Sequence, residues 1–283
     1  MKAKIVSAFI LIALASMACG INIDLPKVPT PGPLVTDKIE VPNPGSDEAR
    51  LNLSFGVGDL TLSPGAEKNL VEGTATYNYD EFKPVVNTKG RDISIQMGDI
   101  EFKGFPAFDE LTNEWDLKLG DRPMELVIEA GAYDATYEFG GLSLTGLSIT
   151  DGAADVKLSF SEPNRSEMNL LRYETGASNV KMEGLANANF SALTFKGGAG
   201  DYTLDFSGDL QRDAAVTIET GLSNIILVIP EGINAVISVE SGVSNINAGP
   251  GWEQDGDRYS IEGEGSTLTI IVEMGAGNLS IIK

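Results

Sequence analysis

The chain has 283 residues, with 41 acidic and 20 basic side chains, no histidine and one cysteine, and a formal net charge of −21. This balance argues against nucleic-acid binding, which needs a basic face to displace counterions from phosphate. The lack of histidine removes His-dependent triads and most zinc and iron sites. The 32 glycines separate short apolar runs, which favours strands over helices.

The first 18 residues have the pattern of a signal peptide. Lys2 and Lys4 precede an apolar run, residues 5–15, that is too short for a membrane span. Cys19 follows directly, in a context that resembles the lipobox of bacterial lipoproteins, where this cysteine carries the lipid. Ser16 stands where that pattern prefers Leu, so ordinary cleavage and secretion are the alternative. We predict attachment to the membrane through Cys19.

Residues 19–46 are predicted to combine the lipid-attachment cysteine with a tether. Six prolines lie between residues 26 and 44, a composition typical of a semi-rigid polyproline-like linker. A tether has a use if its start is anchored, which favours an extracytoplasmic, membrane-anchored lipoprotein. The other interpretation is a disordered tail without a role.

Residues 47–125 are predicted to form a β-rich N-terminal cap region. It contains one early copy of the repeated phrase described next, at Gly56 and Asp59. Between Gly56 and Gly131 the period is otherwise lost. A stack of repeats needs a cap at its end, because an open strand edge recruits other chains.

From residue 126 to the end, a short glycine phrase recurs, with spacings of 21–24 residues between Gly131 and Gly242. Asp or Asn follows each opening glycine by three residues, and apolar side chains precede it by three and five. This period predicts an all-β fold, a parallel β-solenoid of stacked two-strand rungs. We expect each glycine to supply a turn angle that other residues resist, and each Asp or Asn to bond the turn. The turn ladder comprises Gly131 and Asp134, Gly152 and Asp155, Gly176 and Asn179, Gly198 and Asp201, Gly221 and Asn224, Gly242 and Asn245, and Gly275 and Asn278.

The last phrase, GAGNLSIIK, ends at the final residue, so the C-terminal edge of the predicted stack has no evident cap. We expect this edge either to pair with another molecule or to be covered by residues 249–265.

One strand of the predicted stack, within LSNIILVIPEG at 222–232, breaks the usual alternation. Ile226 and Val228 are apolar at outward positions where other rungs have Lys, Ser, Thr, Glu or Asp. A strand that is apolar on both faces is usually covered on both. We expect another part of the chain to cover this surface, with a partner protein as the alternative.

Several segments resemble the bacterial toast-rack family: ARLNLSFGVGDLTLSPG at 49–65, YNYDEFKP at 77–84, NEWDLKLGDRPMELVIEAGA at 113–132 and LSLTGLSITDGAADVKLSF at 142–160. The later rungs are similar to the adhesin-like and cell-wall-antibiotic-response β-domains of envelope stress proteins. The resemblance implies a cap region followed by stacked β-rungs in a lipid-anchored or secreted envelope protein, an adhesin or a sensor. It supplies no catalytic residues.

Two chemical hypotheses are weaker than a structural role for the same residues. Asp80, Glu81 or the Asp ladder would offer carboxylates to a polysaccharide lyase or hydrolase. Asp134, Asp155 and Asp201 would offer oxygen ligands to calcium, although half of the ladder positions are Asn, which suits turn bonding equally well. We therefore predict no catalytic residue, metal or cofactor.

The sequence as a whole predicts a non-enzymatic cell-envelope lipoprotein with an adhesin-like or sensing role. An envelope protein or a glycan is the expected partner, and nucleic acid is not. A polysaccharide-processing enzyme is the alternative.

Overall fold

The computed structural model describes residues 31–45, 48–98 and 110–283. The predicted signal peptide, Cys19 and the first part of the predicted tether lie outside the described residues. Among those described, no helix has the length and apolar character that a membrane span requires.

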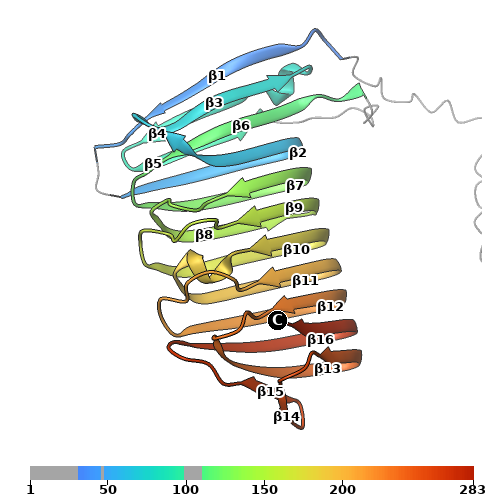
Figure 1. Cartoon of the computed structure of the whole chain (residues 1–283). Helices are drawn as coiled ribbons and strands as arrows, with labels where there is room; N and C mark the ends of the chain where they lie inside the picture. Colours follow the sequence, from blue (N-terminus) through green and yellow to red (C-terminus); the bar gives the residue numbers. More distant parts are fainter. Residues whose placement is uncertain (1–30, 46–47, 99–109) are drawn as a thin grey trace, which may run out of the picture. The chain divides into compact units, whose positions relative to one another are not determined.

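The described part of the chain is all-β, with two short 3-10 turns, η1 (Asp80–Phe82) and η3 (Leu185–Ala188). The strands are β1 (Val35–Pro42), β2 (Ala49–Ala66), β3 (Asn69–Tyr77), β4 (Pro84–Lys89), β5 (Asp92–Met97), β6 (Asn113–Gly120), β7 (Met124–Glu138), β8 (Leu144–Asp151), β9 (Ala153–Ser159), β10 (Met168–Glu183), β11 (Phe190–Asp205), β12 (Ala214–Val228), β13 (Asn234–Ala248), β14 (Glu253–Asp255), β15 (Arg258–Ile261) and β16 (Thr267–Ile282). They form one sheet in the order β1-β3-β6-β2-β7-β8-β10-β11-β12-β16-β13-β15-β14, with β9 beside β7 and β10, and β4 paired to β5 beside β2 (Figure 1).

Strands β7 to β13 and β16 stack in parallel, each in register with its neighbours in space. Most are 15 or 16 residues long and run through the phrase glycine as one bent strand, whereas the copy at Gly152 is divided into β8 and β9. This differs from the predicted pair of strands joined by a tight turn. Because neighbouring strands bend at the same place, the ladder of backbone hydrogen bonds continues around the bend.

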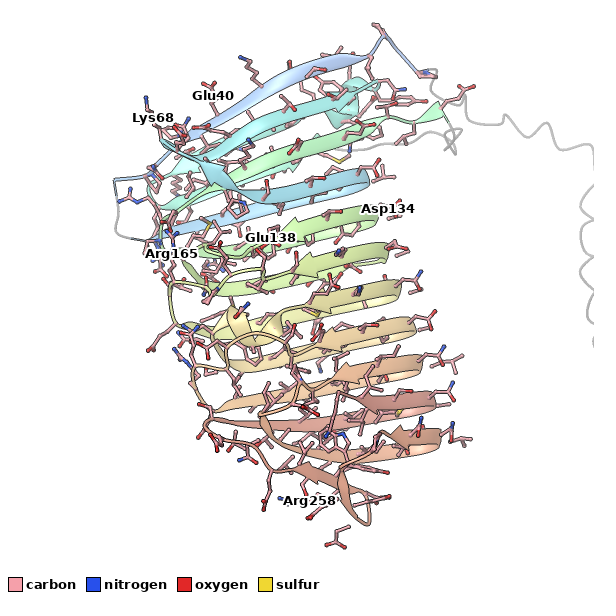
Figure 2. The ribbon with its side chains drawn as sticks, in the orientation of Figure 1. Glu40, Lys68, Asp134, Glu138, Arg165 and Arg258 are labelled. Atoms are coloured by element: carbon pink, nitrogen blue, oxygen red, sulfur yellow. The ribbon has the colours of Figure 1, made fainter. Side chains whose placement is uncertain are left out.

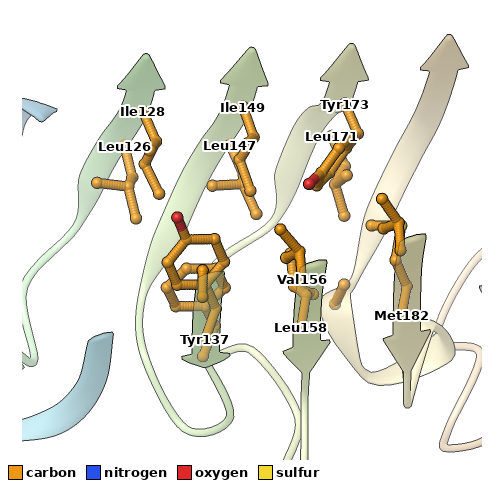
Figure 3. Close-up of a cluster of buried hydrophobic side chains, with 14 of the residues drawn as sticks. Leu126, Ile128, Tyr137, Leu147, Ile149, Val156, Leu158, Leu171, Tyr173 and Met182 are labelled. Atoms are coloured by element: carbon orange, nitrogen blue, oxygen red, sulfur yellow. The ribbon is translucent and has the colours of Figure 1, made fainter. Parts of the chain in front are cut away.

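The core lies on the inner side of this bend. In β7, Leu126 and Ile128 are buried before Gly131, and Ala135 and Tyr137 are buried after it, so the alternation slips by one residue at the glycine. Both halves of each strand therefore turn their apolar side chains inward. Figure 3 shows Leu126, Ile128, Leu147, Ile149, Leu171 and Tyr173 on one layer, across from Tyr137, Val156, Leu158 and Met182 on the other.

The apolar pairs that precede each glycine in the sequence are all buried, with no more than 3% of any side chain exposed. They are Leu51 and Leu53, Leu126 and Ile128, Leu147 and Ile149, Leu171 and Tyr173, Leu193 and Phe195, Val216 and Ile218, Ile237 and Val239, and Ile270 and Val272.

The N-terminal strands close the first end of the stack. β2, which contains Gly56, pairs in parallel with β7 from Ala49 to Leu62 and with β6 on its other side. β3 and β1 follow in antiparallel pairing. β1 lies within the predicted tether, so the last part of that segment is a strand. Its Ile39 and Val41 alternate with polar residues and are buried, and this burial holds β1 to the sheet.

The last strand of the chain does not form the C-terminal edge. β16 lies between β12 and β13, and β13 is the outer rung, covered by β15 over its first half. The expectation that the final phrase forms the edge is therefore wrong. The residues of the second halves give the physical reason: after the phrase Asn, β16 has Leu279, Ile281 and Ile282, whereas β13 has only Ile246 and Ala248 as apolar residues. The more apolar rung occupies the inner place.

Candidate interaction surface

The structure brings the residues of the predicted turn ladder together in two rows at the bend of the strands. The Asp or Asn residues pair in register along the stack in the order Asp59, Asp134, Asp155, Asn179, Asp201, Asn224, Asn278 and Asn245. Asp134 lies at the edge of the stack where the strands bend (Figure 2).

The row of phrase glycines is required by close packing. A Cβ on Gly198 would lie 2.3 Å from the carbonyl oxygen of Gly176, and one on Gly131 would lie 2.2 Å from that of Gly56. None of the eight glycines has a positive φ, so the expected special turn angle is not the reason for their presence. That angle occurs two residues later in some strands, as at Gly200 and Gly277.

The side chains of the Asp and Asn row are exposed, and part of the row is joined by hydrogen bonds. Asn224 Nδ2 donates to Asp201 Oδ1 at 2.7 Å, and Asn278 Nδ2 donates to Asn224 Oδ1 at 2.6 Å. Amide side chains one strand apart form such ladders readily. At the other end, Asp59, Asp134 and Asp155 are adjacent carboxylates. Over the described residues, no group of three or more His, Cys, Asp or Glu is placed to hold a metal ion.

A buried carboxylate beside this row escaped the sequence reasoning. Asp151, the last residue of β8, is 7% exposed and directly precedes a phrase glycine. Its Oδ2 accepts hydrogen bonds from the hydroxyl groups of Tyr173 at 2.6 Å and Tyr133 at 3.3 Å, and its Oδ1 accepts one from Thr175. The sequence signal is an ionisable residue where the other strands have Phe, Ala, Thr, Gly, Ser or Met.

Burial makes the tyrosines around Asp151 poor acids. Burial is the largest cause that raises the pKa of Tyr133 and Tyr173 well above the ordinary value of a tyrosine. The nearby Asp151 carboxylate and neighbouring tyrosines raise it further. Burial is also the main reason why the pKa of Tyr202 rises to about 12, and the charges of Asp151 and Asp201 contribute to the rise. These hydroxyl groups therefore stay protonated at neutral pH, and those of Tyr133 and Tyr173 donate hydrogen bonds to Asp151, which makes this cluster a structural one.

A groove of about 770 Å³ runs along the bend of β10, β11, β12, β16 and β13. It is lined by phrase glycines and by the residues that directly precede them in each strand. Its charged side chains pair in register as Glu174, Lys196, Glu219, Glu273 and Glu240, and we call it the corner groove. Lys196 Nζ lies 2.6 Å from Glu219 Oε2. Within the described residues, Glu240 and Glu273 form no ion pair, so the end of the groove near β13 is acidic.

The predicted apolar surface is exposed in the structure. Ile226 is 38% exposed and pairs in register with Thr203 and Ser280, while Val228 is half-buried and pairs with Ile282, which is 41% exposed. No described segment covers Ile226, and the expected cover from within the chain stays a prediction. Two further apolar side chains are exposed next to the phrase glycines at the bend: Leu222 of β12 at 65% and Val243 of β13 at 83%.

The carboxylates suggested for polysaccharide chemistry do not all meet in one site. Asp59, Asp134 and Asp155 of the ladder line one hollow together with Lys157, whereas Asp80 and Glu81 are exposed in η1 and do not line it.

One family model matches the chain: the N-terminal domain of toast_rack, DUF2154, aligns with residues 30–182, more than half of the 283 residues. The match extends across residue 125 into the region of the regular repeat. None of the curated proteins compared is a match.

Solved structures similar to the chain come from Clostridium, Bacteroides and Parabacteroides species. A proposed cell adhesion protein from Clostridium sporogenes is 22% identical, covering 88% of this chain and 99% of its own, with a TM-score of 0.49. A proposed adhesin from Bacteroides fragilis is 12% identical, covering 88% and 97%, with a TM-score of 0.47. A proposed lipid-binding protein from Parabacteroides distasonis is 10% identical, covering 89% and 98%, with a TM-score of 0.36.

Proposed function

The chain belongs to the toast-rack family, and on this premise we propose that it is a non-enzymatic, adhesin-like binding protein of the bacterial cell envelope. The observation that carries the proposal is the exposed apolar surface of Ile226, Val228 and Ile282 on the outward face of β12 and β16. On the neighbouring strands the outward positions in register with Ile226 are polar, as at Thr203 of β11 and Lys181 of β10. Apolar side chains gathered at such places mark contact sites for proteins.

We propose the parallel β-solenoid as the architecture that presents this surface. Each bent strand is one rung, and the common register of the phrase residues supports this assignment. Stacked rungs form a stiff support, because every inner strand is bonded on both sides. A stiff support suits both an adhesin and an envelope sensor.

The sequence of the N-terminus supports anchoring to the membrane by a lipid on Cys19, with secretion as the alternative. If the anchor is present, Cys19→Ala moves the protein from the membrane fraction to the soluble fraction of cells. Unchanged membrane association of this variant would contradict the anchor.

The binding role is tested by photo-crosslinking in the native cell. A photo-reactive side chain at Ile226 is expected to capture the same envelope protein or glycan in repeated experiments. A probe at Lys181 is the matched control, because this exposed residue occupies the same column two strands away. Equal capture from both positions, or none from Ile226, contradicts the proposal.

The polysaccharide-processing alternative predicts a different result. The purified full chain would release reducing sugar from envelope polysaccharide, and substitution of its carboxylates, Asp80 and Glu81 or the ladder residues Asp134 and Asp155, would abolish the release. Our proposal predicts no release.

A further inference from the structure

The corner groove crosses five strands and has two unlike sides. In each of these strands a charged residue stands two positions before the phrase glycine, and an apolar residue directly follows that glycine. In β13, for example, Glu240 precedes Gly242 and Val243 follows it. Because the phrase glycines carry no side chain, they form a bare floor between a charged side and an apolar side.

The charged side has an excess of carboxylates at the end near β13. Glu219, Glu273 and Glu240 pair in register on adjacent strands, which are about 4.8 Å apart. Lys196 Nζ lies 2.6 Å from Glu219 Oε2. Glu273 and Glu240 are exposed and form no ion pair with any residue that the structure describes. These two carboxylates are therefore available to the cations of a partner.

The other side of the groove is apolar. Leu222 of β12 is 65% exposed and Val243 of β13 is 83% exposed, more than any other large apolar side chain in the described part of the chain. Ala276 of β16 lies in register between them. The same row continues to Ala199 of β11 and Ala177 of β10. Exposed apolar side chains in one row mark a contact site.

The floor of the groove has an unsatisfied polar group behind it. Tyr202 is 1% exposed, and its hydroxyl group has no hydrogen-bond partner among the described residues. The ring ends against Gly197, which lines the groove; a Cβ added to Gly197 would lie 2.7 Å from the hydroxyl oxygen. Buried hydroxyl groups without a partner are rare, and such a group indicates a missing ligand or water beside it.

We propose that the corner groove binds an extended peptide segment in which lysine or arginine residues alternate with apolar residues. Side chains of an extended chain point alternately to opposite sides. A segment that lies along the glycine row therefore turns its cations toward the glutamates and its apolar side chains toward Leu222 and Val243. Five strands about 4.8 Å apart span roughly 19 Å, the length of about six extended residues.

Charge complementarity selects this partner. The chain has a net charge of −21, and the carboxylates of the groove repel an anionic segment. A cation without apolar side chains would leave Leu222 and Val243 uncovered. The proposal does not rest on the Ile226 surface, because Ile226 lies beyond Asn224, on the far side of the Asp and Asn row from Gly221.

Fluorescence anisotropy with labelled six-residue peptides tests the chemistry of the partner. The peptide KVKLKV is expected to bind the purified full chain with Cys19→Ser, with an affinity that falls as salt rises, because exposed charges are screened. The control peptide KTKSKT keeps the positive charges, and EVELEV keeps the apolar residues. Each control should bind at least about tenfold more weakly. No binding of KVKLKV, or equal binding of either control, overturns the proposal.

Variants of the charged side locate the binding site. Glu240→Gln with Glu273→Gln should weaken the binding of KVKLKV by about tenfold. The matched control is Glu114→Gln with Glu264→Gln, which makes the same change in net charge at exposed residues outside the groove and should bind like the parent. Equal affinities of the two double variants would mean that the peptide binds elsewhere.

A third double variant tests the apolar side. Leu222→Thr with Val243→Thr should also weaken the binding of KVKLKV by about tenfold, because less apolar surface is buried in the complex. Both side chains are exposed, so the melting temperature should stay unchanged, and this measurement confirms that the variant is folded. An affinity equal to that of the parent would overturn the proposed role of the apolar side.

Discussion

Asp151 is a single carboxylate that connects three neighbouring strands. It ends β8, and the hydroxyl groups that donate to it come from Tyr133 on β7 and from Tyr173 and Thr175 on β10. Hydrogen bonds to a charged acceptor are roughly twice as strong as those between neutral groups. Because the tyrosines remain protonated, they compensate the cost of burying the carboxylate.

The role of Asp151 predicts a large difference between two Asp→Ala variants. Asp151→Ala leaves the buried hydroxyl groups of Tyr133 and Tyr173 without their acceptor, which should lower the free energy of unfolding by about 2–5 kcal/mol. Asp134→Ala, at an exposed place in the Asp and Asn row, should change it by less than about 0.5 kcal/mol. Urea denaturation of both variants measures the difference, and similar midpoints would show that the network contributes little.

At the scale of the element, the bent strand depends on the contact between stacked glycines. The Cα of each phrase glycine rests on the carbonyl group of the glycine one strand away, but the closeness of the contact varies. A Cβ at position 198 would lie 2.3 Å from the neighbouring oxygen, and one at position 152 would lie 3.1 Å away. The copy with more room is the one where the strand is divided into β8 and β9.

This variation predicts unequal costs for the same chemical change. Gly198→Ala should destabilise the chain by about 2 kcal/mol or more, because two backbones must move apart. Gly152→Ala should cost less than about 1 kcal/mol, because small shifts relieve its contact. Thermal and urea unfolding of the two variants provide the comparison. If glycine were needed only for a turn angle, both variants would lose similar amounts.

The period of the sequence was enough to predict the rows of the stack but not their order. Every phrase has the same pattern of inward apolar positions around its glycine, so β13 and β16 fit equally well beside β12 as far as the pattern is concerned. The available signal was the 33-residue interval from Gly242 to Gly275, which is longer than the other spacings and contains β14 and β15. Asp151 was missed for a similar reason, because its partners lie on other strands and the period does not mark its position.

At the scale of the whole stack, strands with two neighbours differ from strands with one. β16 is bonded to β12 and β13 on its two sides, whereas the outer sides of residues 241–248 of β13 and of β1 have no described partner strand. Local opening needs fewer broken contacts at an end than in the middle. Stability should therefore follow the order of strands in space, not their order in the sequence.

Hydrogen exchange distinguishes these two orders. β16 contains the last residues of the chain, and chain ends usually fray; if sequence order governed stability, its amides would exchange fastest. The structure predicts the reverse: amides of Thr267–Ile282 should exchange at least about tenfold more slowly than those of residues 241–248, because only the former are paired on both sides. Faster exchange in β16 than in the second half of β13 would mean that the final strand lies at the end of the stack, and the insertion of β16 between β12 and β13 would have to be abandoned.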